Sequence, residues 1–254
     1  MRAALLLYLI SAAAQPPPPP NDAFLLACAR GQPECAPVWD APVPPTYTAT
    51  VGTPHGPFSI FVNTSWAPAM AARFFVLTQL GYSRGGPFYR VLAAPSRAFV
   101  AQWGYRGVPV VDAAWAALRT SNATAPVLLS NARGTVAFGT SEVPNDGRHP
   151  GCTAPLCSQG FAVELFVNLA DNARLDAMGF SPFGVVTFGM AAIDKLYAGY
   201  GECADLCAGE APPSPFCVPS PRGGWAGVNF TAMLAEGAEN YLRPNFPLLD
   251  YVAQ

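Results

Sequence analysis

The chain has 254 residues, of which 51% are hydrophobic and 12% are charged, and its formal net charge at pH 7 is −2. This length and composition indicate a globular domain with a substantial core, not a disordered chain. Because no run of basic residues is present, we expect binding neither to nucleic acid nor to an anionic membrane surface.

The first 15 residues are predicted to be a cleaved signal peptide. Met1-Arg2 is a short positive region, residues 3–14 are apolar, and residues 11–14 are small enough for cleavage. The alternative is an uncleaved anchor, although spanning a bilayer takes about 20 apolar residues. We therefore expect a protein of the secretory pathway, in the lumen of the endoplasmic reticulum or secreted, with no stable insertion into a membrane.

Residues 16–44 are predicted to be a proline-rich extension that carries cysteines and precedes the main domain. It begins with five prolines, which favour polyproline II. We interpret the extension as a terminal strap closed by a disulfide, and a docking element is the alternative.

Seven cysteines follow the signal peptide, and in an oxidising compartment they predict disulfides between near neighbours. The expected pairs are Cys28 with Cys35, Cys152 with Cys157, and one pair among Cys203, Cys207 and Cys217. The odd cysteine would be free or intermolecular. Zinc held with His149 is the alternative for the middle pair, but the chain has no Cys-x-x-Cys motif, so we expect no metal.

Three Asn-x-Ser/Thr sequons agree with a glycoprotein of the secretory route. They are Asn63-Thr64-Ser65, Asn122-Ala123-Thr124 and Asn229-Phe230-Thr231.

Residues 45–254 are predicted to form one domain that is mainly β. Residues 47–62 predict a hairpin, and a helix is expected to begin at Ala67-Pro68 and to end at Gly81-Tyr82. Strands are expected at 99–104, 133–140 and 164–172, and a second helix at 193–202. A Cys- and Pro-rich loop at 203–225 then leads to a helix-strand tail. Short strands with few helices suit an antiparallel barrel.

Two short segments in this domain resemble the cyclophilin family of peptidyl-prolyl cis-trans isomerases. They are Gly86-Pro87-Phe88-Tyr89-Arg90-Val91 and Phe99-Val100-Ala101-Gln102-Trp103-Gly104. The usual forms in the family are Phe-His-Arg-Val and Phe-x-x-Gln-Gly-Gly. The resemblance extends over residues 45–254 and implies a closed eight-stranded antiparallel β-barrel capped by two α-helices.

The resemblance also implies an active site that needs no metal or cofactor. Arg90 would donate to the prolyl nitrogen, and Gln102 would orient Arg90 or bind the substrate backbone. The substrate-binding residues that it implies are Phe99, Phe138, Glu164, Phe166 and Phe180. The expected partners are proline-containing peptides or client proteins, and the expected state is a monomer.

Three positions depart from the family pattern. Tyr89 replaces a His, and Glu164 stands where a Gln is usual, so that its carboxylate could pair with Arg90 or accept from the substrate. Arg174 replaces a Trp that is associated with cyclosporin-type inhibitors, so we expect weak inhibition. An insertion between Thr140 and Glu164 leaves the choice of substrate open.

Two other functions compete with an isomerase that assists protein folding. One is a catalytically weak proline-peptide-binding module or chaperone, and the other is a structural secreted domain. Other enzyme classes are disfavoured, because His55 falls in an expected turn and no nucleophile elbow or P-loop is found.

Overall fold

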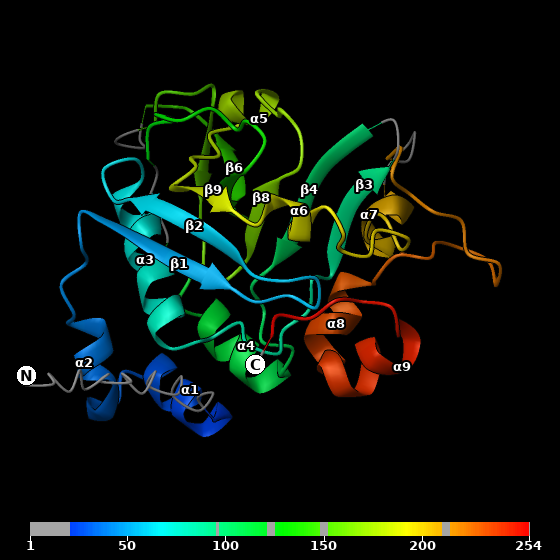
Figure 1. Ribbon diagram of the computed structural model, residues 1–254, viewed down its shortest axis with the longest axis horizontal. Helices are drawn as coiled ribbons and strands as arrows, with labels where there is room; N and C mark the ends of the chain where they lie inside the picture. Colours follow the sequence, from blue (N-terminus) through cyan, green and yellow to red (C-terminus); the bar gives the residue numbers. More distant parts are fainter. Residues whose placement is uncertain (1–20, 95–96, 121–124, 148–151, 210–213, 254) are drawn as a thin grey trace, which may run out of the picture.

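The computed structural model describes residues 21–94, 97–120, 125–147, 152–209 and 214–253. The predicted signal peptide, the proline run, the sequon at Asn122 and His149 of the alternative zinc site lie outside these residues. Figure 1 shows the order of the helices and strands. No helix within the described residues is long and apolar enough to cross a membrane.

Antiparallel strands form the centre of the domain. Their bounds are β1 Thr46–Val51, β2 Phe58–Asn63, β3 Arg90–Ala94, β4 Arg97–Trp103, β5 Thr135–Phe138, β6 Ser141–Pro144, β7 Leu156–Gln159, β8 Leu165–Asn168 and β9 Gly184–Phe188. Seven of them form one sheet in the order β1-β2-β9-β5-β8-β4-β3, and β6 and β7 form a separate hairpin. The predictions of a mainly β domain and of a hairpin at 47–62 are confirmed.

The predicted closed eight-stranded barrel is not confirmed by the described residues. Within the described residues the main sheet has seven strands, and its edge strands β1 and β3 are not paired with each other. The C-terminal segment contributes isolated contacts in place of a continuous strand: Tyr251 bridges to Pro87, and the Ala253 N–H donates to the Gly52 carbonyl oxygen at 2.9 Å.

The helices surround this sheet, and more than two are present. Their bounds are α1 Asp22–Ala29, α2 Ala36–Trp39, α3 Pro68–Gln79, α4 Pro109–Ala116, α5 Arg174–Ala177, α6 Met190–Ile193, α7 Ala204–Gly209, α8 Phe230–Gly237 and α9 Arg243–Asn245. A 3-10 turn, Pro33–Cys35, precedes α2, and a π-helical turn, Ala238–Leu242, joins α8 to α9. The helix expected at 67–81 is confirmed as α3. Pro68 lies in its first turn, where a backbone N–H would have no partner within the helix, so the missing N–H of proline costs no hydrogen bond.

The prediction of a second helix at 193–202 is wrong. Helix α6 ends at Ile193, and residues 194–202 follow as turns and irregular backbone. At Gly201 a φ of 67°, which favours glycine, also excludes a helix at the end of the predicted range. The carboxylate of Asp250 accepts a hydrogen bond from the Tyr197 N–H at 2.7 Å, so the chain here is held by the tail.

Two clusters of buried side chains lie on the two faces of the sheet. The larger includes Trp103, Phe138 and Leu165, and the smaller includes Val100, Ala137 and Phe166. Alternation along each strand explains the division, since neighbouring residues point to opposite faces. The side chains of two residues that are adjacent in a strand therefore lie on opposite faces of the sheet.

The N-terminal extension packs against α4. The Trp115 indole N–H donates to the Leu25 carbonyl oxygen at 2.9 Å, and the Trp39 ring stacks on the Trp115 ring with centroids 5.6 Å apart. Figure 1 shows α1 and α4 side by side below the sheet.

The predicted cysteine pairs are confirmed. Disulfides join Cys28 to Cys35 and Cys152 to Cys157, so the two sulfurs of the middle pair are bonded to each other and are not zinc-binding thiolates. The third bond joins Cys207 to Cys217. The odd cysteine is Cys203, whose thiol is free and buried.

Candidate active site

Three adjacent strands place the predicted polar and aromatic residues on one face of the sheet. Arg90 on β3 lies directly opposite Gln102 on β4, and Gln102 lies opposite Phe166 on β8. Directly opposed residues share a face, and their Cβ atoms are about 5 Å apart. The register therefore brings the arginine, the amide and the aromatic ring together, as the sequence predicted.

A cavity of about 140 Å³ lies beside these residues. Its lining consists of Arg90, Phe99, Val100, Gln102, Gly139, Thr140, Glu164, Phe166, Leu175 and Phe180. Six of the seven residues predicted for the site are in this set, although they come from four separate stretches of the chain. We call this space the Arg90 cavity.

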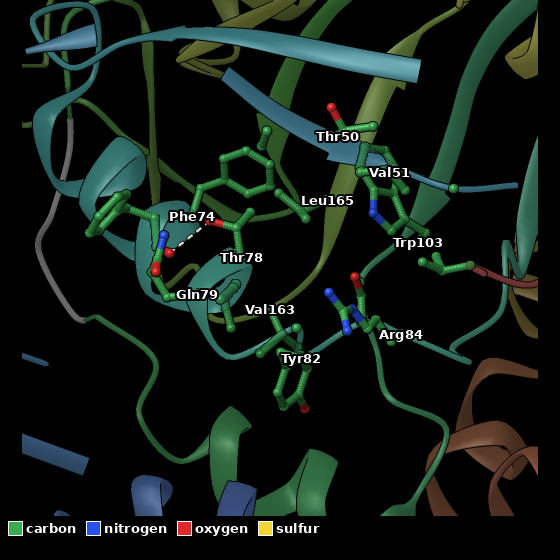
Figure 2. Close-up of a pocket in the computed structure, with 18 of the residues that line it drawn as sticks. Thr50, Val51, Phe74, Thr78, Gln79, Tyr82, Arg84, Trp103, Val163 and Leu165 are labelled. Atoms are coloured by element: carbon green, nitrogen blue, oxygen red, sulfur yellow. Dashed lines mark hydrogen bonds between the residues drawn. The ribbon is translucent and has the colours of Figure 1, made fainter. Parts of the chain in front are cut away.

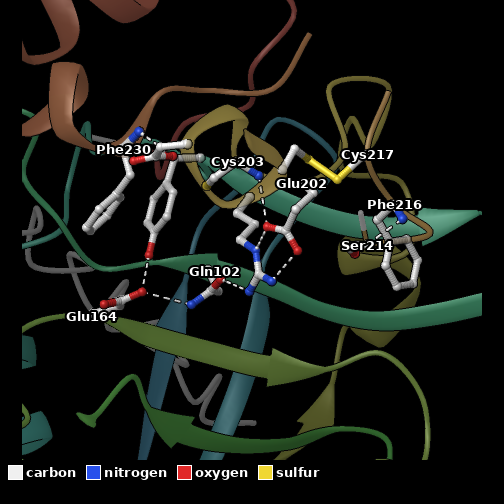
Figure 3. A network of polar contacts seen from close by, with 12 residues as sticks. Gln102, Glu164, Glu202, Cys203, Ser214, Phe216, Cys217 and Phe230 are labelled. Atoms are coloured by element: carbon white, nitrogen blue, oxygen red, sulfur yellow. Dashed lines mark hydrogen bonds and ion pairs between the residues drawn. A yellow bond between two sulfur atoms is a disulfide. The ribbon is translucent and has the colours of Figure 1, made fainter. Parts of the chain in front are cut away.

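The Arg90 side chain is fixed by a second residue, Glu202. Arg90 Nε and Nη2 donate to the two carboxylate oxygens of Glu202, and the Nη2–Oε2 distance is 2.6 Å. Arg90 Nη1 donates to Gln102 Oε1. The exposed fractions of the Arg90 and Glu202 side chains are only 14% and 5%. Because the pair is bidentate and both side chains are largely shielded from solvent, it holds the guanidinium in one orientation (Figure 3).

The three hydrogen bonds leave part of the guanidinium unused. The group has five N–H bonds, and three donate to Glu202 and Gln102, so two have no partner among the described residues. Arg90 lines the cavity, and its Cζ atom lies 5.9 Å from the centroid of the Phe99 ring. An anchored donor therefore remains available beside an aromatic wall.

The hydrogen bonds continue from Gln102 to Glu164 and Tyr89. Gln102 Nε2 donates to Glu164 Oε1 at 2.8 Å, and the Tyr89 hydroxyl donates to the same oxygen at 2.5 Å (Figure 3). Glu164 does not bond to Arg90. The carboxylate instead fixes the amide orientation of Gln102, so that its oxygen faces Arg90.

Burial changes the protonation equilibria of this network. Desolvation lowers the pKa of Arg90, but the hydrogen bond and charge of Glu202 outweigh it, and the pKa stands above its ordinary value. Desolvation raises the pKa of Glu164, while the Tyr89 hydroxyl and the Arg90 charge oppose that increase. Burial, with the charge of Glu164, raises the pKa of Tyr89 well above its usual range, so Tyr89 remains a donor.

Aromatic rings form the other side of the Arg90 cavity. The Phe166 and Phe180 rings meet edge to face with centroids 5.7 Å apart. At the rim, the Arg174 guanidinium lies over the Phe99 ring, with Cζ 4.3 Å from the ring centroid. Thr140 Oγ1 is buried there without a hydrogen-bond partner among the described residues. The cavity can therefore hold a small apolar ring beside the Arg90 guanidinium.

Phe138 does not reach the Arg90 cavity, and its predicted place in the pocket is wrong. It is fully buried on the opposite face of the sheet, where its ring contacts Phe161 and Phe183. Ala137 is the β5 residue that faces the same side as Phe166. Because side chains alternate along a strand, a shift of one residue moves a ring from the pocket to the core.

Glu202 was missed as a site residue by the sequence reasoning. It lies 112 positions from Arg90 in the sequence and follows an irregular segment, so no spacing signals their contact. The available signal was a lone carboxylate within the Gly-Tyr-Gly-Glu segment at 199–202. A buried arginine needs an anion, and this carboxylate supplies it.

A second cavity of about 200 Å³ lies on the other side of the network. Its lining comprises Tyr89, Arg90, Gln102, Glu164, Cys203, Asp205, Leu206 and Phe230. The Cys203 thiol is buried here, and desolvation raises its pKa to about 12, so the thiolate form is scarce near neutral pH.

Comparison with known proteins places most of the chain in one family. The family model of cyclophilin type peptidyl-prolyl cis-trans isomerases matches residues 47–206. A solved structure of such an isomerase from Cryptosporidium parvum covers 60% of this chain and 86% of its own, with 14% identity and a TM-score of 0.43. The same protein solved in the presence of the dipeptide Ala-Pro covers 59% and 87%, again with 14% identity and a TM-score of 0.43. No curated protein sequence matches the chain.

Proposed function

The chain belongs to the cyclophilin-type peptidyl-prolyl cis-trans isomerase family, and on that basis we propose that it accelerates rotation about X-Pro bonds in client proteins. One observation carries the proposal. The Arg90 guanidinium is anchored by Glu202 and Gln102, yet two of its N–H bonds, which lie beside an aromatic cavity, have no partner among the described residues.

The chemistry requires no nucleophile. The barrier to rotation of a peptide bond is about 20 kcal/mol, because resonance delocalises the nitrogen lone pair. Twisting the bond localises that lone pair, so a donor that binds the twisted nitrogen better than the planar one lowers the barrier. Arg90 is the proposed donor, since its guanidinium stays charged and its orientation is fixed before substrate binds.

The other predicted residues take supporting roles in this proposal. Gln102 positions Arg90 through its amide oxygen. Phe99, Phe166 and Phe180 hold the proline ring in the Arg90 cavity. Glu164 Oε2 accepts no hydrogen bond from the described residues, which supports a role in accepting from a substrate N–H.

The test is an NMR exchange measurement on a short Ala-Pro peptide, with the chain that remains after removal of the predicted signal peptide. We expect Arg90→Ala to lose at least about 100-fold of the catalysed exchange, the effect of removing one transition-state donor. Arg243→Ala is the matched control, because Arg243 forms an exposed pair with Glu239 away from the cavity. Equal activity in wild type and Arg90→Ala would contradict the assignment.

A proline-peptide-binding module is the second candidate, and the Arg90–Glu202 pair is the observation that favours it. The Glu202 carboxylate accepts from two N–H bonds of Arg90, and its negative charge offsets part of the positive charge that Arg90 could present to the substrate nitrogen. In that case the peptide resonances shift with the wild-type protein, but no exchange is catalysed by either protein.

We further propose that the protein acts as a monomer in the secretory pathway, in the endoplasmic reticulum lumen or after secretion. Three disulfides and three sequons support this location, because disulfides persist in oxidising compartments. A tagged full-length protein in eukaryotic cells is expected to lose its N-terminal segment and to shift in mobility on deglycosylation. An uncleaved and unglycosylated protein in the cytosol would contradict the location.

A further inference from the structure

A groove runs along β1 on the face of the sheet opposite to the Arg90 cavity. Its volume is about 420 Å³, and one wall is the strand itself from Tyr47 to Val51. Figure 2 shows Thr50 and Val51 across the space from Tyr82 and Arg84, with Trp103 and Leu165 between them. The second half of α3 closes one side. We call this space the β1 groove.

The strand that forms the wall has a free edge. Among the described strands, β1 pairs only with β2. Thr53 and Gly56 exchange two main-chain hydrogen bonds at the hairpin turn, whereas the Gly52 carbonyl oxygen accepts from Ala253 on the opposite side. Because the main-chain groups of successive residues alternate in direction, the N–H and C=O groups of Thr48 and Thr50 point away from β2.

In the described part of the chain these main-chain groups are unpaired, and they border the groove. No hydrogen bond within the described residues reaches the N–H or C=O group of Thr48 or Thr50. Both residues line the groove. An edge of this kind is a template for another strand, since its donors and acceptors repeat with the spacing of a peptide backbone.

The floor of the groove contains a second unpaired donor. The Trp103 indole N–H is buried without a hydrogen-bond partner within the described part of the chain, and the Trp103 side chain is fully buried. Because this N–H has almost no accessible surface, a ligand in the groove would reach it only after the neighbouring side chains move. Among the described residues that line the groove, Arg84 alone is charged. A lining with so few charges, beside the unpaired main-chain groups of Thr48 and Thr50, favours an uncharged ligand that has hydrogen-bond donors and acceptors of its own.

We propose that the β1 groove binds an extended, uncharged peptide segment of a partner protein as an additional strand beside β1. The strand would continue the ladder that the Ala253–Gly52 hydrogen bond begins, toward Thr50 and Thr48. Helix α3 and the loop at 81–84 form the opposite wall, and this enclosure favours a single strand over the edge of a second folded sheet. The proposal does not depend on isomerase activity.

The first test uses the peptide acetyl-Thr-Val-Thr-Val-Thr-amide as the probe and NMR-detected hydrogen exchange as the readout. The Thr48 and Thr50 amides are expected to exchange more slowly when the peptide is bound. The Tyr47 and Ala49 amides point toward β2 and serve as the internal control. A peptide with the same side chains and alternate N-methyl groups lacks the pairing donors and is expected to have no effect. Equal binding of both peptides would overturn the proposal.

A pair of variants tests the protein side of the interaction. Thr50→Pro removes the N–H that points into the groove, and an edge strand tolerates proline at such a position. Thr50→Val keeps that N–H, and both variants lose the Thr50–Ser59 side-chain hydrogen bond. We expect peptide binding to weaken about fivefold in Thr50→Pro, the effect of one main-chain hydrogen bond, and to be unchanged in Thr50→Val.

Two further outcomes would also overturn the proposal. One is unchanged exchange of Thr48 and Thr50 up to the solubility limit of the peptide. The other is protection of these amides without peptide that increases with protein concentration, since that result would assign the edge to a second copy of the chain.

Discussion

The carboxylate of Glu202 holds the guanidinium of Arg90 through two hydrogen bonds in a nearly solvent-free setting. The Cys203 N–H donates to Glu202 Oε1 at 2.8 Å and fixes the carboxylate in turn. The orientation of the proposed donor therefore depends on a residue that does not line the Arg90 cavity.

The first prediction concerns this pair. Glu202→Ala leaves a buried arginine without an anion, so the free energy of unfolding should fall by about 3 kcal/mol. The kcat for a prolyl peptide should fall about tenfold with little change in KM, because the donor loses its orientation, and Glu202→Gln should recover part of the loss. Glu239→Gln is the control, since Glu239 pairs with Arg243 at an exposed position and should change stability by less than about 1 kcal/mol. A higher kcat in Glu202→Ala would mean that the carboxylate restrains the donor.

The second prediction concerns the pH dependence of stability. Burial raises the pKa of Glu164 in the folded state above its unfolded value of about 4.3. The protonated carboxyl therefore contributes to the stability of the fold. That contribution is lost as the pH rises from the unfolded pKa through the folded pKa. The free energy of unfolding of wild type should therefore decline relative to Glu164→Gln as pH increases above about 4. Denaturant titrations of both proteins between acidic and neutral pH measure this difference. A constant difference over that range would contradict the prediction.

The third prediction separates two phenylalanines on opposite faces of the sheet. Phe138→Ala should lower the free energy of unfolding by about 3–5 kcal/mol, because it empties a fully buried site. The kcat/KM of the folded fraction should change little. Phe166→Ala removes a wall of the Arg90 cavity and should reduce kcat/KM at least tenfold. Activity assays corrected for the folded fraction distinguish the two positions, and equal losses of kcat/KM would place both rings in the substrate site.

The fourth prediction concerns the rim residue Arg174. The family resemblance associates a Trp at this position with binding of cyclosporin-type inhibitors, and Arg174 instead covers the Phe99 ring. Arg174→Trp should therefore bind cyclosporin more tightly than wild type, as measured by isothermal titration calorimetry. Arg97→Trp places the same side chain at the exposed start of β4 and is the control. Equal gains in both variants would indicate non-specific contact.

Much of the site was predictable because its signals are local. Arg90 and Gln102 belong to two strands of one hairpin, and their direct pairing follows from its register. The sequence also predicted three disulfides, because their partners are near neighbours in the chain.

One error arises from the parity of a strand, and two arise from long-range geometry. Phe138 was assigned to the wrong face because a motif position does not specify the parity of a strand. Glu202 comes to Arg90 through packing of an irregular segment, and closure of the sheet would require pairing between its edge strands β1 and β3. Neither depends on a pattern within a window of ten or twenty residues.

The free thiol of Cys203 gives the protein a built-in reporter of its own fluctuations. It is the one cysteine of the seven outside a disulfide, it is buried, and its main chain contacts Glu202. A thiol reagent can reach it only after this region opens. The rate of labelling therefore measures how often the segment that carries Glu202 and Cys203 moves away from Arg90. Labelling under native conditions should then slow when a proline peptide occupies the Arg90 cavity, which would give a readout of occupancy without a label added by mutation.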